Sequence, residues 1–348
     1  MRKTVAIIHF NTPELTEAVI LSLRKQCAED YAVVVFDNSD KRPFTKKMKG
    51  VRRIDNTPTG STSPPAPCWT SQNKPHRPHF SIFALAMTVE EMEKLLRDEA
   101  KALVEKEPLS KLMLEEQVLN RKDFADMLGV TLACQLAGEV IDRTELEKMF
   151  SALYVKYPEL LVSAVKDLHA TVLRDAACTS HLEPLLFFKG FQGLQAYRAA
   201  HALWEEGRSF PAKMFQSIIS RKFGMDIHPA AKIGHGLLID HATNLVIGET
   251  AVVGNNVSFL HGVTLGGTGN EVGDRHPKIG NGVMLGAHAQ LLGNIHIGDC
   301  AKIGAGAVVL CDVPAHTTYA GVPAVEVGHP TDETPSFNMQ QDFTRDCD

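Results

Sequence analysis

Side chains able to do acid–base chemistry are concentrated in the last third of the chain. Nine of the fifteen histidines lie between Asp226 and His329, where the segments DIHP, IDHAT and GDRHPK combine histidine with an acid or an arginine. Histidine gains and loses a proton near neutral pH, and a neighbouring carboxylate can fix its tautomer and stabilise its charged form. The pattern therefore indicates a general base or, because histidine also binds metals, a metal site.

The elements that must position these groups are marked by glycine and by a six-residue period. Eighteen of the 26 glycines fall between Asp226 and His329, and eight precede Asp226. Apolar residues recur there every six positions, which fits neither the helical period of 3.6 nor the strand period of 2. The repeating positions are Ile227, Ile233, Ile239 and Leu245, then after a phase jump of two Ile247, Val253, Phe259 and Leu265, and finally Ile279, Leu285, Leu291, Ile297, Ile303 and Val309.

A six-residue repeat predicts a parallel β-helix of about five coils. One apolar side chain per flat side points inward, glycine and small residues form the corners, and three sides of about 18 residues complete a coil. The step from Leu265 to Ile279 is longer than two whole repeats, so the phase is lost between them. We therefore expect the residues between them to leave the coil as an extruded loop. Stacked coils leave exposed ends and flat faces, so self-association is expected.

These segments closely resemble the serine acetyltransferase family of hexapeptide-repeat acyltransferases. The resemblance rests on DIHPAAKIGHGLLIDHATNLVIGETAVVG, GVTLGGTG, GDRHPKIG and HTTYAGVPA in this order, and it runs from about Thr88 to Phe343. It implies an α+β fold, with an all-helical N-terminal domain followed by a left-handed parallel β-helix. It also implies acetyl transfer from acetyl-CoA to the hydroxyl of L-serine, which gives O-acetyl-L-serine and CoA in cysteine biosynthesis.

The resemblance assigns His241 and Asp226 as a catalytic dyad. Their separation in the sequence is slightly less than one coil, and adjacent coils can bring them within reach. Because a serine hydroxyl is protonated at pH 7, His241 would act as the general base for direct attack on the thioester in a ternary complex. Cys300 and Cys311 are expected to pack as small apolar residues, so no covalent nucleophile is needed.

Both substrates have candidate ligands at positions that match the family. A zwitterionic amino acid needs groups of both signs, and arginine can hold a carboxylate through two parallel hydrogen bonds. The candidates for L-serine are Asp175 and Asp240 for the ammonium group, Arg275 for the carboxylate, and His276 for orientation or for developing charge. The candidates for acetyl-CoA are Gly267, Thr268, Ala287, Lys302 and Ala305, with the lysine for a phosphate.

The first eighty residues lie outside this resemblance. The pattern of residues 1–57 predicts a strand, a helix and a strand, and it resembles the start of nucleotide-sugar glycosyltransferases, with an acid at Asp37. The metal-binding DxD motif of those enzymes is missing, so we expect a non-catalytic β-α-β fragment. Residues 58–80 hold six prolines and should form a linker.

The remaining boundaries follow from the change of pattern. We expect a helical domain of six to eight helices over residues 81–225. Its first helix should begin at a capping box, Thr88 with Glu91, and close at Pro108. The β-helix should cover residues 226–330, and a C-terminal tail should follow over 331–348.

The composition indicates which cellular compartment and which kinds of partner to expect. The chain has 36 Lys+Arg against 41 Asp+Glu, a net charge of -5 and a pI near 6.3, which is too mild to indicate nucleic acid or an anionic membrane. No apolar run approaches the ~18 residues of a membrane helix, and no signal-peptide pattern opens the chain. Seven cysteines without a CxxC pair fit reduced thiols. We therefore expect a cytoplasmic protein.

The family also suggests protein partners. It implies a homotrimer with active sites between subunits, or a dimer of trimers joined through the helical domain. Family members insert a C-terminal tail that ends in isoleucine into cysteine synthase (O-acetylserine sulfhydrylase). This chain has the matching PSFNMQQDF at 335–343 but ends in Asp348, and an acidic terminus does not suit the same apolar pocket. That complex is therefore in doubt.

Three other interpretations compete with this one. The first is another hexapeptide acyltransferase, which acts on a sugar or a xenobiotic. The second is a γ-type carbonic anhydrase, which holds zinc between subunits with histidines spaced by five. Here glycine or asparagine stands five positions after His261, His276 and His288, so no metal is expected. The third is a scaffold with an inactive β-helix.

Overall fold

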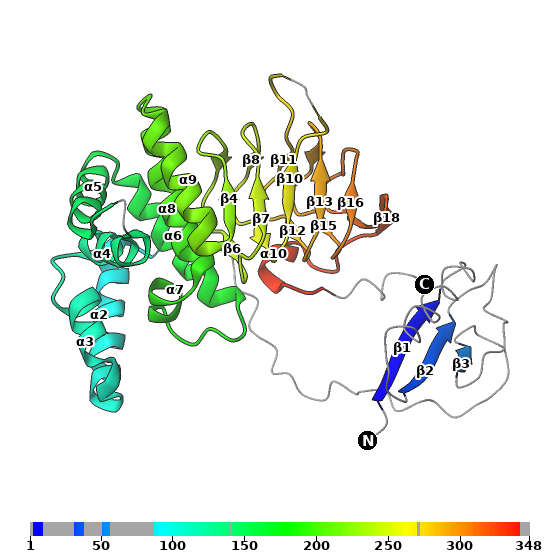
Figure 1. Cartoon of the computed structure of the whole chain (residues 1–348), viewed down its shortest axis with the longest axis horizontal. Coiled ribbons are helices and arrows are strands. Elements are labelled where there is room, and N and C mark those ends of the chain that lie inside the picture. Colours follow the sequence, from blue (N-terminus) through cyan, green and yellow to red (C-terminus); the bar gives the residue numbers. More distant parts are fainter. Residues whose placement is uncertain are drawn as a thin grey trace. The chain divides into compact units, whose positions relative to one another are not determined.

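The computed structural model describes residues 3–9, 31–37, 51–55, 87–138, 141–269 and 272–341. The chain divides into two compact units, Met1–Arg77 and Pro78–Asp348 (Figure 1). Within the described ranges, every helix is too short or too polar to span a lipid bilayer.

The first unit contains a parallel sheet. β1 (Lys3–His9), β2 (Tyr31–Asp37) and β3 (Val51–Asp55) pair in the order β1-β2-β3, with Asp37 and Asp55 in register at the ends of neighbouring strands. The two predicted strands are confirmed. β3 was not predicted, because VRRID has no apolar run. The expected helix at 14–26 and the expected linker at 58–80 lie outside the described residues.

The second unit begins with a layer of helices. α2 (Val89–Lys106) starts at the predicted capping box, where Thr88 Oγ1 accepts a hydrogen bond from the backbone of Glu91 at 3.1 Å and Glu91 accepts one from the backbone of Thr88 at 2.8 Å. The other α-helices of the layer are α3 (Lys111–Leu114), α4 (Phe124–Leu136), α5 (Arg143–Lys156), α6 (Glu159–Arg174), α7 (Leu182–Leu186), α8 (Lys189–Glu205) and α9 (Ser209–Phe223). The described part of this layer thus holds eight α-helices, at the upper end of the expected range.

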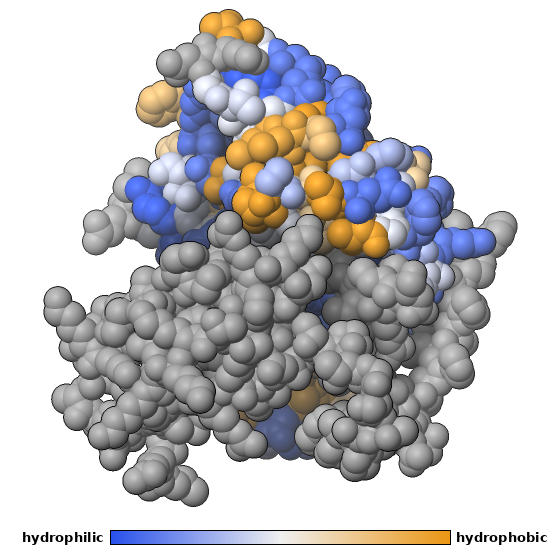
Figure 2. All heavy atoms as spheres, turned by 90° about the vertical axis from the view of Figure 1, so that its right-hand side faces the viewer, coloured by the Kyte–Doolittle hydropathy of each residue, from blue (hydrophilic) through white to orange (hydrophobic). Residues whose placement is uncertain are grey.

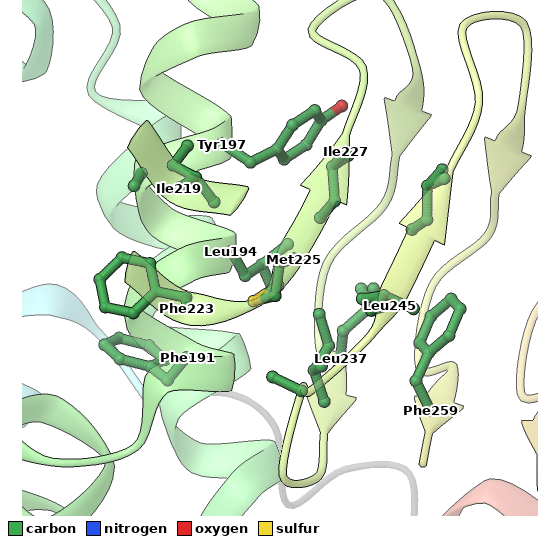
Figure 3. Close-up of a cluster of buried hydrophobic side chains, with 14 of the residues drawn as sticks. Phe191, Leu194, Tyr197, Ile219, Phe223, Met225, Ile227, Leu237, Leu245 and Phe259 are labelled. Atoms are coloured by element: carbon green, nitrogen blue, oxygen red, sulfur yellow. The ribbon is translucent and has the colours of Figure 1, made fainter. Parts of the chain in front are cut away.

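Helix α8 packs closely against the first coil of the β-helix. A Cβ atom at Gly190 would lie 2.0 Å from the carbonyl oxygen of Ile239, and one at Gly193 would lie 2.3 Å from Sδ of Met225. At Gly190 the obstacle is backbone, so only glycine allows this approach. Figure 3 shows the resulting apolar contact, with Phe191, Leu194 and Tyr197 beside Met225 and Ile227. The helices and the β-helix therefore share one core.

A buried ionic network fixes the same junction. Asp167 on α6 is fully buried, and its Oδ2 accepts hydrogen bonds from Arg198 Nη2 at 2.7 Å and from Gln195 Nε2 at 3.0 Å. Its Oδ1 accepts one from the backbone of Leu237 at 2.9 Å. Because both carboxylate oxygens have donors, the network joins α6, α8 and the first coil without an unpaired acceptor.

The described part of the β-helix has three sheets, each built from one side of successive coils, and their strands run parallel except for the last strand of sheet III. Sheet I contains β4 (Met225–Ile227), β7 (Leu245–Ile247), β10 (Thr264–Gly266), β13 (Gln290–Leu292) and β16 (Val308–Val309). Sheet II contains β5 (Lys232–Ile233), β8 (Val252–Val253), β11 (Lys278–Ile279) and β14 (His296–Ile297). Sheet III contains β6 (Leu238–Ile239), β9 (Ser258–Phe259), β12 (Met284–Leu285), β15 (Lys302–Ile303), β17 (Thr318–Gly321) and β18 (Ala324–Gly328).

The register confirms the predicted period. Ile279 pairs with Ile297, three repeats later, and the predicted inward residues are buried except Ile233, which is partly buried against the core. Two coils are longer than this regular one. The coil from Ile233 to its partner Val253 holds a short insertion, and the coil from Val253 to its partner Ile279 holds a larger one. The larger insertion is the predicted extruded loop between β10 and β11 (Figure 1).

The chain ends with elements that the six-residue period does not predict. β18 is antiparallel to β17 and follows the cis peptide bond between Val322 and Pro323. The tail then turns back along the β-helix to α10 (Pro335–Asn338) (Figure 1). The carbonyl oxygen of Ser336 accepts a hydrogen bond from Ser258 Oγ of sheet III at 2.7 Å. The expected tail is described as far as residue 341. Figure 2 shows the molecule from the side of this end, where apolar side chains gather in a patch bordered by hydrophilic ones.

Candidate active site

A cavity of about 420 Å³ lies where the helical layer meets the first coil. Three residues chosen from the sequence line it: Asp175, Asp240 and His241. The other lining residues are Ala177, Phe187, Phe188, Lys189, Gly190, Leu238, Ile239 and Thr243. The cavity therefore joins two carboxylates and an imidazole from segments far apart in the sequence.

Asp175 caps the C-terminal end of α6. Its backbone N–H donates to the carbonyl of Thr171 at 2.9 Å, and its Oδ1 accepts from the backbone N–H of Ala177 at 2.8 Å. A carboxylate at this end of a helix is opposed by the helix dipole. This position is therefore poor for helix stability, but it presents a negative charge to the cavity.

Asp240 and His241 lie in the turn between β6 and β7. The backbone of His241 has a positive φ of 56°, which is uncommon outside glycine. Its Nε2 lies 3.6 Å from Oδ1 of Asp240, and its side chain is 72% exposed. Burial raises the pKa of Asp240, although the charge of His241 opposes this shift. The turn also contains the short insertion between Ile233 and Val253.

Histidines follow one another along this corner of the β-helix. The ring of His261 lies 5.9 Å from that of His241 and 4.9 Å from that of His288, centroid to centroid. Among the residues that the structure describes, no group of three or more His, Cys, Asp or Glu side chains is arranged to hold a metal ion.

Asp226, the second member of the predicted dyad, lies on β4. Its Oδ1 accepts a hydrogen bond from Gln216 Nε2 of α9 at 2.7 Å. Across the sheet it pairs with Val246 of β7. No hydrogen bond or ion pair between the described residues joins Asp226 to His241, so the dyad stays a prediction.

Arg275 and His276 stand where the extruded loop returns to β11. Arg275 Nη2 donates to Glu249 Oε2 at 2.7 Å. His276 is 7% exposed, and its Nδ1 accepts from the backbone N–H of Thr250 at 3.2 Å, so the neutral ring carries its proton on Nε2. Burial, helped by the charge of Arg275, lowers the pKa of His276.

The predicted substrate ligands thus fall into two groups within one chain. Asp240 and His241 lie at the corner between sheets III and I, and Asp175 lines the same cavity from the end of α6. Arg275 and His276 lie at the corner between sheets I and II and do not line the cavity. The family resemblance assigns both groups to one site, but within one chain they lie at different corners of the β-helix.

The acetyl-CoA candidates divide in the same way. Gly267 and Thr268 open the extruded loop, beside Arg275, while Ala287 and Ala305 occupy the corner of His241 on later coils. Lys302 lies on β15 and is 5% exposed. All five assignments stay predictions.

Lys189 is a cation that lines the cavity and that the sequence pattern did not predict. Lys189 begins α8, and its Nζ donates to Oγ1 of Thr243 at 2.5 Å. The available signal was its position, since a lysine in the first turn of a helix opposes the dipole and gains little there unless it has another use.

Two family models match the chain. The model described as serine acetyltransferase, N-terminal, matches residues 94–196, and the model described as bacterial transferase hexapeptide (six repeats) matches residues 276–311. Serine acetyltransferase of Salmonella typhimurium is 47% identical over 260 residues, which cover 74% of this chain and 95% of that protein. Serine acetyltransferase 2 of Arabidopsis thaliana is 48% identical over 251 residues, or 72% of this chain and 78% of that protein.

Solved structures agree with this match. Serine acetyltransferase from Vibrio cholerae superposes with a TM-score of 0.72 at 44% identity, covering 74% of this chain and 99% of that one. Soybean serine acetyltransferase complexed with serine has a TM-score of 0.67 at 47% identity, with 69% and 98% covered. Serine acetyltransferase from Brucella abortus in complex with coenzyme A has a TM-score of 0.68 at 43% identity, with 69% and 96% covered.

Proposed function

Because the chain belongs to the serine acetyltransferase family, we propose that it transfers the acetyl group of acetyl-CoA to the hydroxyl of L-serine. The products are O-acetyl-L-serine and CoA, and the reaction serves cysteine biosynthesis. The observation that carries the proposal is the cavity that joins Asp175, Asp240 and His241. The left-handed β-helix and its helical layer match the fold of the family's solved structures.

The carboxylates that line this cavity suit the positively charged ammonium group of L-serine. The two carboxylates, Asp175 and Asp240, would hold the ammonium group of L-serine. Burial of Asp240 raises its pKa, which means that its charge is poorly solvated and gains from a cation. The soybean relative was solved with serine bound, which supports this substrate.

The chemical step needs one base. His241 would accept the hydroxyl proton while the serine oxygen attacks the thioester carbon. The new C–O bond forms, the C–S bond breaks, and the CoA sulfur leaves as a thiolate that takes the proton back from the imidazolium. Asp226 would support the charged imidazole, as the family resemblance assigns.

Arg275 and His276 would complete the site from a neighbouring chain. They would hold the substrate carboxylate, but in one chain they lie at a different corner from His241. Association of β-helices side by side would bring the two corners together, so we propose a homotrimer, or a dimer of trimers, with sites between subunits.

Acetyl-CoA is the proposed co-substrate, because the Brucella abortus relative was solved with coenzyme A. Its proposed ligands lie in the extruded loop, at the corner of His241 and on β15. They are Gly267, Thr268, Ala287, Lys302 and Ala305. Catalysis would use the helical layer over 81–225, the β-helix over 226–330 and the tail over 331–348. Residues 1–57 and the linker at 58–80 would take no part in it. We further propose a cytoplasmic location.

The proposal is tested by measuring thiol release from acetyl-CoA with the full chain. Purified protein is assayed with L-serine and, in parallel, with glucosamine and with galactoside acceptors. We expect saturable release with L-serine and at most background with the sugars. Release with a sugar and none with L-serine would overturn the proposed substrate.

A further inference from the structure

Arg174, which precedes the proposed substrate ligand Asp175 in the sequence, has a buried guanidinium. Arg174 is the last residue of α6 and is 4% exposed. Its Nη1 donates to Ser258 Oγ at 3.1 Å and to the carbonyl of Asn256 at 3.4 Å. Its Nε and Nη2 are buried and have no hydrogen-bond partner among the described residues. Burial lowers the pKa of Arg174 to about 9.

The C-terminal tail covers this guanidinium. The Cζ atom of Arg174 lies 4.1 Å from the ring centroid of Phe337 on α10. Ser258, which accepts from Arg174, in turn donates to the carbonyl of Ser336 at 2.7 Å. An aromatic face attracts a cation most strongly where water is excluded. Phe337 therefore contacts Arg174 directly, and Ser336 contacts the Ser258 hydroxyl that accepts from Arg174.

Stability alone does not account for this arrangement. A buried charge with unsatisfied donors costs free energy, and an apolar side chain of similar volume would fill the same space at lower cost. Helix α10 spans only Pro335–Asn338, which is too short to be stable by itself. Its place on the molecule therefore depends on tertiary contacts, which include those with Arg174 and Ser258.

Arg174 is joined by one peptide bond to Asp175, which lines the substrate cavity. The carboxylate of Asp175 is oriented by the turn to Ala177 and by the last hydrogen bond of α6, from Asp175 N to Thr171 O. Both depend on where α6 ends, and the side chain of Arg174 anchors that end to sheet III and to the tail.

We propose that Arg174 and Phe337 are positioning residues for Asp175, so that docking of the C-terminal tail sets the affinity of the site for the acceptor amino acid. The inference rests on the proposed function, because it assigns Asp175 to the ammonium group of L-serine. The coupling is reciprocal: bound acceptor favours the docked tail, and an undocked tail weakens acceptor binding.

The test compares Phe337→Ala with Phe337→Trp and with the matched tail control Asn338→Ala, which changes an exposed neighbour. Thiol release is measured with both substrates varied, and hydrogen exchange is followed over residues 171–178. We expect Phe337→Ala to raise KM for L-serine about tenfold, because small misplacements of a substrate ligand cost one to two orders of magnitude. The kcat and KM for acetyl-CoA should change less than about twofold.

The other variants and the exchange data complete the design. Phe337→Trp should keep the wild-type KM, since it retains an aromatic face, and Asn338→Ala should match wild type. Exchange over 171–178 should rise in Phe337→Ala alone. An unchanged KM for L-serine in Phe337→Ala, or an equal rise of both KM values, would overturn the proposal. If wild type releases no thiol with L-serine, the proposed function fails, and the exchange result alone decides whether the tail holds the end of α6.

Discussion

Gln216 on α9 donates a hydrogen bond of 2.7 Å from its Nε2 to Oδ1 of Asp226 on β4. The last helix of the helical layer therefore orients the carboxylate that the family resemblance assigns to the catalytic dyad. This contact links the helical layer to the chemistry of the β-helix, in addition to its packing role.

Replacement of Gln216 should therefore reduce turnover without weakening substrate binding. We expect Gln216→Leu to lower kcat by about threefold to tenfold, because a hydrogen bond to a charged group is lost. Asp226→Asn should lower kcat by about a hundredfold, within the range of general acid–base catalysis. Steady-state kinetics provide the measurement, with Lys222→Ala as an exposed control on the same helix. A normal kcat in Gln216→Leu beside an impaired Asp226→Asn would show that Gln216 does not orient the carboxylate.

The imidazole of His276 fills the space above Gly248. A Cβ atom at position 248 would lie 2.0 Å from Cδ2 and Nε2 of that ring. Gly248→Ala should therefore displace His276 and lower kcat/KM for L-serine at least about tenfold. Gly138→Ala is the matched control, since an added Cβ there meets no heavy atom within 4 Å. Full activity in Gly248→Ala would contradict a role of His276 at the site.

Asp240 should show a conflict between stability and function. Its pKa is raised by burial, so the folded state binds the proton more tightly than the unfolded state does. Such a group destabilises the fold as pH rises through its folded pKa, and the effect vanishes below the unfolded value of about 3.9. Asp240→Asn should therefore raise Tm at pH 7 by about 2 °C and not at pH 3.5.

The same substitution should weaken the substrate site. Loss of a carboxylate partner for the ammonium group should raise KM for L-serine about tenfold or more. Thermal melts between pH 3.5 and 8 and steady-state kinetics test the two halves. A lower Tm at pH 7, or an unchanged KM, would contradict this account of Asp240.

The buried pair of Asp167 and Arg198 holds the junction that shapes the cavity. The side chains are 1% and 8% exposed, and Arg198 Nη2 donates to Asp167 Oδ2 at 2.7 Å. Arg198→Met should destabilise the fold by about 3–5 kcal/mol, since it leaves a buried charge unpaired. The double variant Asp167→Asn with Arg198→Met should lose less.

Urea unfolding measures both losses. Lys148→Ala is the matched control, because its partner Glu145 forms an ion pair that is largely exposed. Its stability should stay close to that of wild type. A double variant no more stable than Arg198→Met would contradict the role of the unpaired charge.

The β-helix could be predicted from the sequence because its signal is local and periodic. Leu265 and Ile279 bound the extruded loop as expected, and the register of Ile279 with Ile297 follows from the six-residue step. The phase jump of two was visible as well, and the structure places the inserted residues in the turn of Asp240. Interruptions of a regular repeat thus marked both groups of proposed site residues.

The rest could not be predicted, because it depends on contacts between distant segments. The stacking of Phe337 on Arg174 joins residues whose flanking patterns have nothing in common. Family motifs place Arg275 beside His241 in a shared site, but they do not say that one chain holds these residues at different corners. Lys189 was missed because a single lysine before an apolar helix resembles an ordinary surface residue.

The central claim is that His241 is the base for acetyl transfer to L-serine. The most direct measurement is thiol release from acetyl-CoA and L-serine by wild type and by His241→Asn. His241 is exposed, so the substitution should leave Tm unchanged. We predict that kcat falls by about 10² to 10⁴, with little change in KM for either substrate. A His241→Asn variant with wild-type kcat would contradict the account.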